Sequence, residues 1–252
     1  MIKLITSTWG NGSSYNVENT VTYRTFAKYN NPENFVAFHF NRGNYYLEEV
    51  DYGSRMGVQA EYILYKIDLL REKVRDLETD YIIFCDANDV TCCGQIEKCI
   101  DLFDLDNKIV FSAERNDWPK PDKVAGWENY RNYNEWDRHN RMYLNSGVQL
   151  AKKSKYLELL DSCMENFVQH NYQGAGGDQG AFTWHYNMIE EPKIQLDYAN
   201  IFALSTYDSN IDDYCKNGDR IYSKKYGTSP YFIHDNGTNY GGQKFAARFG
   251  LN

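Results

Sequence analysis

The 252-residue sequence predicts an α/β fold in which helices cover the faces of a central sheet. Three observations lead to this prediction. Short apolar runs rich in β-branched residues alternate along the chain with longer segments of helical periodicity. The length suits one large domain, and 42% of the residues are hydrophobic, so a substantial core can form. No apolar run approaches the roughly 20 residues that a membrane-spanning helix needs, so we expect no membrane span.

The elements follow in order from the first residues. Residues 2–6 predict a strand, residues 14–29 a helix, and residues 35–40 a second strand. Apolar residues within 62–77 recur at the three- and four-residue spacing of an amphipathic helix. Residues 80–85 form a nearly continuous apolar run, which is typical of a buried parallel strand.

The alternation continues in the second half of the chain. Residues 96–103 predict a helix and residues 109–112 a strand. A strand is expected again at 143–150, followed by a helix at about 153–170. The glycine-rich turn at 174–179 opens a further helix. Strands separated by helices in this way favour an α/β sheet over an all-β or all-α fold.

Residues 115–141 interrupt the pattern. They are rich in Trp, Tyr, Asn and charged residues and show no clear period. A loop of this length inside a compact domain is usually functional, so we expect a lid or an acceptor-binding insert. No linker divides the chain, which predicts a single domain over 1–252.

The charge balance limits how the chain can meet an anionic partner. With 27 basic and 35 acidic residues the net charge is -8, which excludes a protein that binds nucleic acid with its whole surface. The charge is uneven, however. Residues 115–155 hold 9 basic and 5 acidic groups and residues 216–252 hold 6 and 2, so each block is +4. Such blocks predict a basic rim that suits a nucleotide, or an anionic acceptor such as DNA.

Cysteine usage and the first residues predict a cytoplasmic protein. Four of the six cysteines lie between 85 and 99, but the adjacent pair Cys92–Cys93 does not fit the paired C-x2-C spacing of a zinc site. Reduced thiols are the better interpretation. Met1 leads directly into the first predicted strand, without the charged and apolar regions of a secretory signal.

Asp86, Asn88 and Asp89 follow the apolar run 80–85 immediately. Ligands of α/β proteins bind outside the carboxyl ends of the strands, where two carboxylates three residues apart can point into one crevice. Paired carboxylates suit Mg²⁺ or Mn²⁺, which in turn bind diphosphate oxygens. The alternative interpretation is that one of the aspartates caps a helix that follows.

Further short motifs stand downstream in a definite order. They are F-S-A-E at 111–114 followed by Trp118-Pro119, L-N-S-G at 144–147, D-Q at 178–179, L-D at 196–197 with I-F at 201–202, and H-D-N-G at 234–237. Together with D-x-x-D they resemble the glycosyltransferase domain of the procollagen lysyl hydroxylase family. The resemblance spans residues 1 to about 240. It implies a GT-A glycosyltransferase fold, that is, a Rossmann-like mixed central sheet flanked by helices, with a long acceptor-side loop.

The resemblance also divides the domain and implies its ligands. The nucleotide-sugar-binding part is expected at about 1–114 and the acceptor-side part at about 115–252. Asp86, Asp89 and His234 match the metal-binding residues, and a mixed oxygen and nitrogen shell suits Mn²⁺, or Mg²⁺. The alternative interpretation of His234 is that it is a lone histidine at a strand end with a purely structural role. The residues expected to contact a UDP-sugar are Thr6, Thr8, Lys66, Asn88, Asn145, Ser146, Asn236 and Gly237.

The acceptor side involves another four residues. Asp178 and Gln179 match the last two positions of the family's D-D-D-Q, where a carboxylate can take the proton of an acceptor hydroxyl or bind sugar hydroxyls. Glu114 and Trp118 match F-S-A-E…W-P, and the Trp face is either a sugar platform or core.

Two of the donor-side assignments keep a second interpretation. Lys66 meets a phosphate or an acidic partner, or else extends its charge from the helix face to solvent. Asn145 and Ser146 either contact sugar hydroxyls or mark a tight turn or the end of a strand.

Four positions depart from the family pattern. Asn88 stands where the family carries an aromatic residue that packs on the uracil. Gly176 and Gly177 replace the first two aspartates of D-D-D-Q, and Asp235 interrupts H-G-N-G. The function implied is transfer of a hexose from a UDP-sugar to the hydroxyl of a hydroxylysine-like protein, a glycan, or a hydroxymethylated pyrimidine in viral or phage DNA. Both retaining and inverting chemistry occur on this fold. The alternatives are a non-catalytic sugar- or nucleotide-binding module and a phosphohydrolase that uses the same carboxylates.

Overall fold

The computed structural model describes most of the chain. The described ranges are 1–10, 16–41, 56–115, 143–170, 177–189, 191–236 and 245–251. The predicted long loop at 115–141 lies outside them apart from Arg115, and so do Trp118 and Gly237.

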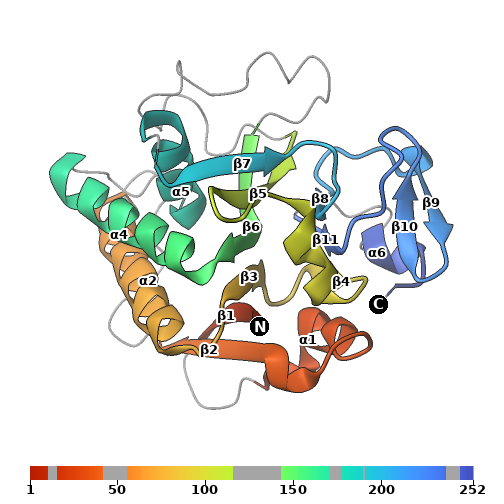
Figure 1. The fold of residues 1–252 in the computed structure, drawn as a ribbon, viewed down its shortest axis with the longest axis horizontal. Helices are drawn as coiled ribbons and strands as arrows, with labels where there is room; N and C mark the ends of the chain where they lie inside the picture. Colours follow the sequence, from red (N-terminus) through yellow and green to blue (C-terminus); the bar gives the residue numbers. More distant parts are fainter. Residues whose placement is uncertain are drawn as a thin grey trace.

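A mixed six-stranded sheet forms the centre of the molecule (Figure 1). Its strand order is β2-β1-β3-β6-β5-β7, and β6 runs antiparallel to both of its neighbours, whereas the other neighbouring pairs are parallel. The strands are β1 (Ile2–Gly10), β2 (Phe35–Asn41), β3 (Tyr81–Asp86), β5 (Lys108–Glu114), β6 (Tyr143–Lys152) and β7 (Lys193–Asp197). The expected mixed α/β architecture is thus confirmed.

Different layers cover the two faces of this sheet. The long helices α2 (Met56–Asp76), α4 (Lys153–His170) and α5 (Gly177–Met188) lie together on one side of it in Figure 1. The other face packs against α1 (Val21–Phe26), the 3-10 helix η3 (Ile96–Leu102) and a small second sheet. This second sheet has the order β4-β11-β8, with β4 (Val90–Cys92), β11 (Phe232–His234) and β8 (Ala203–Ser205).

The remaining elements are short. They are η1 (Val17–Asn19), η2 (Pro32–Asn34), η6 (Ile211–Asp213), the hairpin of β9 (Tyr214–Asn217) and β10 (Arg220–Ser223), and α6 (Phe245–Arg248).

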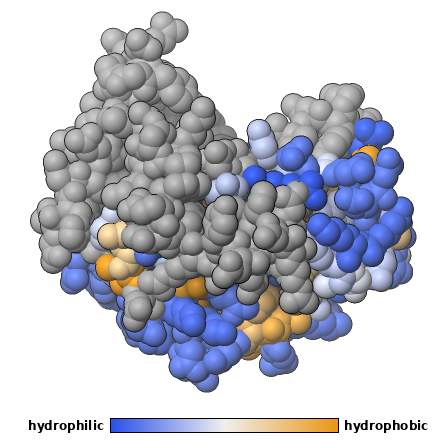
Figure 2. Space-filling model, turned by 90° about the horizontal axis from the view of Figure 1, so that it is seen from above, coloured by the Kyte–Doolittle hydropathy of each residue, from blue (hydrophilic) through white to orange (hydrophobic). Residues whose placement is uncertain are grey.

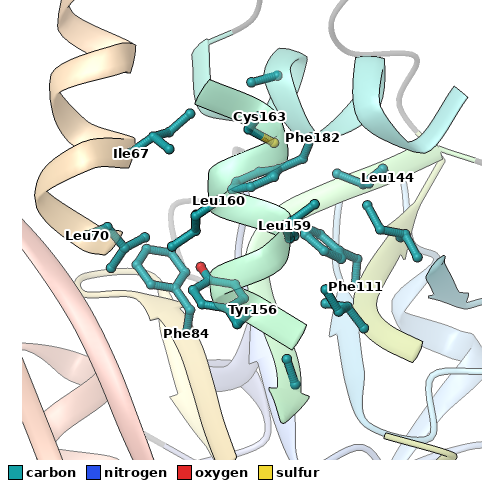
Figure 3. Close-up of a cluster of buried hydrophobic side chains, with 14 of the residues drawn as sticks. Ile67, Leu70, Phe84, Phe111, Leu144, Tyr156, Leu159, Leu160, Cys163 and Phe182 are labelled. Carbon is teal, nitrogen blue, oxygen red and sulfur yellow. The ribbon is translucent and has the colours of Figure 1, made fainter. Parts of the chain in front are cut away.

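Alternation along the central strands builds two cores, one on each face. In β3, Ile82 and Phe84 face the long helices while Ile83 and Cys85 face the second sheet, as the two-residue period of a strand requires. Figure 3 shows the first core, where Phe84 lies near Leu70 of α2 and side chains of α4. Because both faces are covered, the run 80–85 is apolar throughout, which explains the sequence pattern.

Two predicted helices differ from the structure. The described part of the expected helix, 16–29, is not one helix. Thr20 has extended backbone and its hydroxyl accepts the Tyr23 N–H, so α1 begins at Val21. The helix expected at 96–103 is the 3-10 helix η3. The other helices and strands expected before residue 171 are present close to their predicted bounds, and a helix also follows the glycine-rich turn.

No helix of the described part of the chain is long and apolar enough to cross a bilayer. On the face shown in Figure 2, the visible described residues are mostly hydrophilic, and the apolar ones form small patches among them.

Candidate active site

Strand register brings Asp86, Asp89 and His234 together. Asp86 ends β3 at the carboxyl edge of the sheet, where it pairs with Ser7 of the parallel strand β1. Asp89 stands immediately before β4, and β4 pairs antiparallel with β11 so that Val90 lies opposite His234. The second sheet therefore places His234 beside the two carboxylates, although the histidine follows Asp89 by 145 residues in the sequence.

The three side chains form a compact donor cluster. The His234 Nε2 atom lies 3.4 Å from Asp86 Oδ2 and 3.5 Å from Asp89 Oδ2. One ligand atom from each residue falls within 4.8 Å of the others. The side chain of His234 is 5% exposed, against 43% for Asp86 and 34% for Asp89, so the cluster opens on its carboxylate side. Neighbouring ligands of an octahedral ion at about 2.1 Å stand roughly 3 Å apart, which this set approaches.

The turn that carries the aspartates is held by α1 and by the residue after His234. The buried Thr22 hydroxyl lies 2.8 Å from the carbonyl oxygens of both Asp86 and Val90. The Asp235 N–H donates to the Asp89 carbonyl over 2.8 Å. The element after the aspartates is strand β4, so the alternative interpretation in which they cap a following helix is wrong.

Proximity and burial shift the titration of this cluster. Burial raises the pKa of Asp86 to about 6; the charge of His234 opposes this rise and that of Asp89 adds to it. Burial by itself lowers the pKa of His234, but its hydrogen bond to Asp89 and the surrounding carboxylates outweigh burial and raise it. A divalent cation would therefore compete with protons for the Asp86 carboxylate and the His234 imidazole.

Glu114 is a buried carboxylate beside the cluster. Its Oε1 atom accepts from Gln179 Nε2 over 2.8 Å, and its Oε2 atom accepts from Asn236 Nδ2 over 2.7 Å. Burial raises the pKa of Glu114 to about 7, and hydrogen bonds from Gln179, Asn145 and Asn236 oppose that rise. The F-S-A-E glutamate therefore ties β5 to α5 and to the segment after β11.

Asn145 lies between Glu114 and His234. Besides donating to Glu114, it places its Oδ1 atom 2.9 Å from His234 Nδ1. It belongs to a bulge of β6: Phe111 of β5 pairs with Gln149, but the next residue, Ser112, pairs with Asn145. The segment for which a tight turn or a strand end was the alternative is a strand bulge, a feature that often stands next to active sites.

Lys66 forms an ion pair with Asp178, with 2.5 Å between Nζ and Oδ2. Both side chains are largely buried, at 13% and 25% exposure. Of the options for Lys66, the structure favours the acidic partner. The pair joins α2 to the first turn of α5, and it places the carboxylate expected to act as a base next to a positive charge.

The other predicted residues are spread over the same edge and the strands behind it. The Thr6 hydroxyl donates to the Cys85 carbonyl over 2.6 Å, and the Thr8 hydroxyl lies 3.1 Å from His39 Nδ1. Asn88 is exposed on the turn between the two aspartates. The Ser146 N–H donates to Gln179 Oε1 over 3.2 Å.

Part of the basic block at residues 216–252 lies at the end of the small sheet opposite the donor cluster. Arg220 lines a cavity of about 500 Å³ together with Lys28, Lys98, Cys93 and Tyr231. Cys93 follows β4 and Tyr231 precedes β11, whereas the donor cluster is at the other ends of these two strands. The β9–β10 hairpin therefore carries its charge away from the carboxylates.

Two residues at the site had no role assigned from the sequence. Gly147 lies against the His234 ring, since a Cβ atom there would stand 2.1 Å from Cε1 of the imidazole. Asp235 accepts from the backbone N–H groups of Phe245 and Ala246 over 3.0 and 3.4 Å, and so caps α6. The glycine of L-N-S-G was the sequence signal for this close approach of the backbone to the His234 ring. Asp235, the residue that interrupts H-G-N-G, has a structural role as the cap of α6.

Comparisons with known proteins agree with this architecture. One solved structure, a glycosyltransferase involved in the glycosylation of the major capsid of PBCV-1, matches with a TM-score of 0.53 and 13% identity. The match covers 99% of this chain and 97% of that one, which shows a shared fold. A curated relative, the uncharacterized protein R699 of Acanthamoeba polyphaga mimivirus, is 27% identical over 169 residues. That alignment covers 66% of this chain, which spans about a third (33%) of the relative's length.

Fold and family together define a glycosyltransferase domain. Residues 60–241 match the family model of the PLOD GT domain, which is well over half of the chain. The chain therefore belongs to the PLOD GT domain family, and the predicted resemblance is confirmed.

Proposed function

We propose that the chain is a metal-dependent hexosyltransferase that uses a UDP-sugar as donor. The observation that carries the proposal is the cluster of Asp86, Asp89 and His234 at the carboxyl edge of the sheet, in a member of this family. Two carboxylate oxygens and one imidazole nitrogen suit Mn²⁺, or Mg²⁺. A divalent cation held there offsets the charge that develops on a departing diphosphate.

The chain's own residues supply binding and proton transfer. In the proposed reaction the bond from the anomeric carbon to the diphosphate oxygen breaks, and a bond from that carbon to the acceptor oxygen forms. Asp178 takes the hydroxyl proton, while Gln179 holds Glu114 and β6 in place. The residues proposed to contact the nucleotide sugar are Thr6, Thr8, Lys66, Asn88, Ser146, Asn236 and Gly237.

The two proposed parts of the domain meet at this site. Asp86, Asp89 and Glu114 come from the nucleotide-sugar part at about 1–114, while Asn145 and His234 come from the acceptor-side part at about 115–252. The acceptor classes proposed are a hydroxylysine-like protein side chain, a glycan, and a hydroxymethylated pyrimidine in DNA. All six cysteines are free and five are buried, which supports a reducing compartment such as the cytoplasm.

Nucleotide release tests the proposal. The protein is incubated with Mn²⁺, a panel of UDP- and GDP-sugars, and three acceptors: a hydroxylysine peptide, an oligosaccharide and a hydroxymethylcytosine oligonucleotide. We expect Mn²⁺-dependent release of UDP with one of the acceptors. Asp89→Ala is expected to abolish release, whereas Asp106→Ala, a control at an exposed ion pair with Lys152, is expected to leave release unchanged.

The outcomes also separate the alternatives. A thermal shift with Mn²⁺ and a UDP-sugar but no release with any acceptor would favour the non-catalytic binding module. Release of phosphate instead of a nucleoside diphosphate would favour the phosphohydrolase. If no donor gives release and Mn²⁺ gives no thermal shift, the proposed function is wrong.

A further inference from the structure

We propose that Asn145, seated on the β6 bulge, fixes the tautomer of His234 so that the Nε2 lone pair faces the two aspartates. This inference rests on the proposed metal-dependent function and assigns a positioning residue to it. Asn145 was expected to touch sugar hydroxyls, but its side chain is 3% exposed and its oxygen faces protein groups.

The orientation of the Asn145 amide follows from its neighbours. The Gly147 N–H lies 3.0 Å from the side-chain atom assigned as Oδ1. A backbone N–H can only donate, so the atom that it meets must be the acceptor oxygen and not the amide nitrogen. The Ser112 hydroxyl lies 3.0 Å from the same oxygen and 3.1 Å from the Asn145 backbone carbonyl, so both are acceptors for its single proton. The remaining end of the amide is then Nδ2, which is the donor that Glu114 requires.

The tautomer of His234 follows from the amide. The Asn145 oxygen has no proton to give, so the imidazole nitrogen 2.9 Å away must donate to it. In the neutral ring, a proton on Nδ1 leaves the lone pair on Nε2. Nε2 is the atom that lies 3.4 and 3.5 Å from the carboxylate oxygens of Asp86 and Asp89. A metal-binding histidine whose other nitrogen donates to a protein oxygen has its ring orientation set in the same way.

The bulge also fixes the position of the ring. Gln149 of β6 donates from Nε2 to the Ser146 carbonyl over 2.7 Å, which holds the bulged segment together. Gly147 in that segment has no side chain, so the face of the imidazole lies against the backbone. The tautomer and the ring position thus depend on one short segment, Asn145 to Gly147.

The first test needs no metal. Protein with ¹⁵N-labelled histidine is examined in EDTA over a series of rising pH values until the His234 resonances report the neutral ring, because the neighbouring carboxylates raise the pKa of this imidazole. Long-range ¹H–¹⁵N spectra report which nitrogen carries the proton, and His234→Ala identifies the resonances. We expect His234 to carry its proton on Nδ1. In Asn145→Leu both tautomers are expected, whereas Asn145→Asp, which keeps an oxygen acceptor for Nδ1 but loses the donor to Glu114, is expected to keep the proton on Nδ1. A wild-type ring protonated on Nε2 overturns the inference.

The second test measures Mn²⁺ affinity by calorimetry in the absence of any sugar nucleotide, which removes sugar contacts from the comparison. Asn145→Leu is expected to weaken Mn²⁺ binding by roughly 10- to 100-fold, and Asn145→Asp to retain it. Wild-type affinity in Asn145→Leu, together with loss of affinity in His234→Ala, contradicts the positioning role. If the wild-type protein binds no Mn²⁺, the proposed function fails, while the NMR spectra still decide the tautomer.

Discussion

Replacing Gly147 with alanine is the most direct perturbation of the His234 ring. A Cβ atom at this position would stand 2.1 Å from Cε1, 2.4 Å from Nδ1 and 2.7 Å from Nε2. Ordinary contacts begin at 3.4 Å, so the nearest ring atom must retreat by about 1.3 Å. His234 is buried and hydrogen-bonded to Asn145, so it has little room to do so.

The displacement is large on the scale of metal coordination. Ligand distances in protein metal sites are defined to within about 0.2 Å, so a shift of this size misplaces the nitrogen. We expect Gly147→Ala to lower Mn²⁺ affinity by at least 10- to 100-fold, and overpacking to cost roughly 1–3 kcal/mol of unfolding free energy. Calorimetry with Mn²⁺ and thermal melting measure the two effects.

A matched control and a double variant sharpen this test. Gly94→Ala also introduces a close contact, 3.0 Å from the Tyr231 ring, but at the other end of the small sheet. It is expected to destabilise the fold without changing Mn²⁺ affinity. Adding His234→Ala to Gly147→Ala removes the ring, so the double variant is expected to lose less stability than the sum of the single variants. Additive losses, or unchanged Mn²⁺ affinity in folded Gly147→Ala, would refute the reasoning.

Three further predictions concern the surroundings of the cluster. Burial raises the pKa of Glu114 from 4.5 to about 7. Between about pH 4.5 and 7 the folded chain therefore keeps a proton on Glu114 that the unfolded chain has lost. The contribution of Glu114 to the unfolding free energy falls as the pH rises through this range and levels off above it. At 1.36 kcal/mol per pKa unit, the loss of unfolding free energy is on the order of 3 kcal/mol. Urea unfolding in EDTA should show this loss in the wild type but not in Glu114→Gln. Parallel pH curves of the two proteins would contradict the prediction. Asp235→Ala leaves the buried Thr206 hydroxyl and the Phe245 N–H without their acceptor. We expect thermal melts to show a loss of about 1–3 kcal/mol of unfolding free energy. An unchanged melt would show that the Asp235 cap of α6 is unimportant. A double-mutant cycle with Lys66→Met and Asp178→Asn is expected to give a coupling free energy above about 1 kcal/mol. This coupling should exceed that of Lys155 and Glu158, an exposed ion pair three residues apart on α4. Equal couplings would show that burial adds nothing to the Lys66–Asp178 pair.

The strands were predictable because their signal is local. The run 80–85 is apolar at every position because β3 is covered on both faces, and that burial is recorded in consecutive residues. The same run predicted where Asp86 and Asp89 would stand, since the carboxyl end of a strand is a fixed place in an α/β sheet. The split of residues 14–29 was not predicted, because the cap at Thr20 competes with a helical pattern that would otherwise continue through it.

The arrangement around His234 depends on contacts that no local pattern records. Asn145 is 89 residues before His234 in the sequence, and 33 residues separate it from its partner Ser112. Both contacts follow from the shift in register between β5 and β6 and from the pairing of β4 with β11. A single sequence states that Asn145 precedes a serine and a glycine, but not which strands those residues meet. Lys66 kept several interpretations for the same reason, since its partner Asp178 lies 112 residues further on.

Hydrogen bonds join the acceptor side of the proposed site to its metal side. Gln179 donates to Glu114, Asn145 donates to Glu114 with one end of its amide and accepts from His234 with the other, and His234 faces Asp86 and Asp89. Glu114 accepts from both amides, and the Gly147 N–H sets the direction of the Asn145 amide, whose oxygen in turn sets the direction of the bond to His234. A change at Gln179 therefore removes a hydrogen bond to Glu114, although it touches none of the metal donors and leaves the Gly147 contact that orients the Asn145 amide. The loss of two aspartates at Gly176 and Gly177 leaves this connection in place, since it begins at Gln179 and not at the positions that changed.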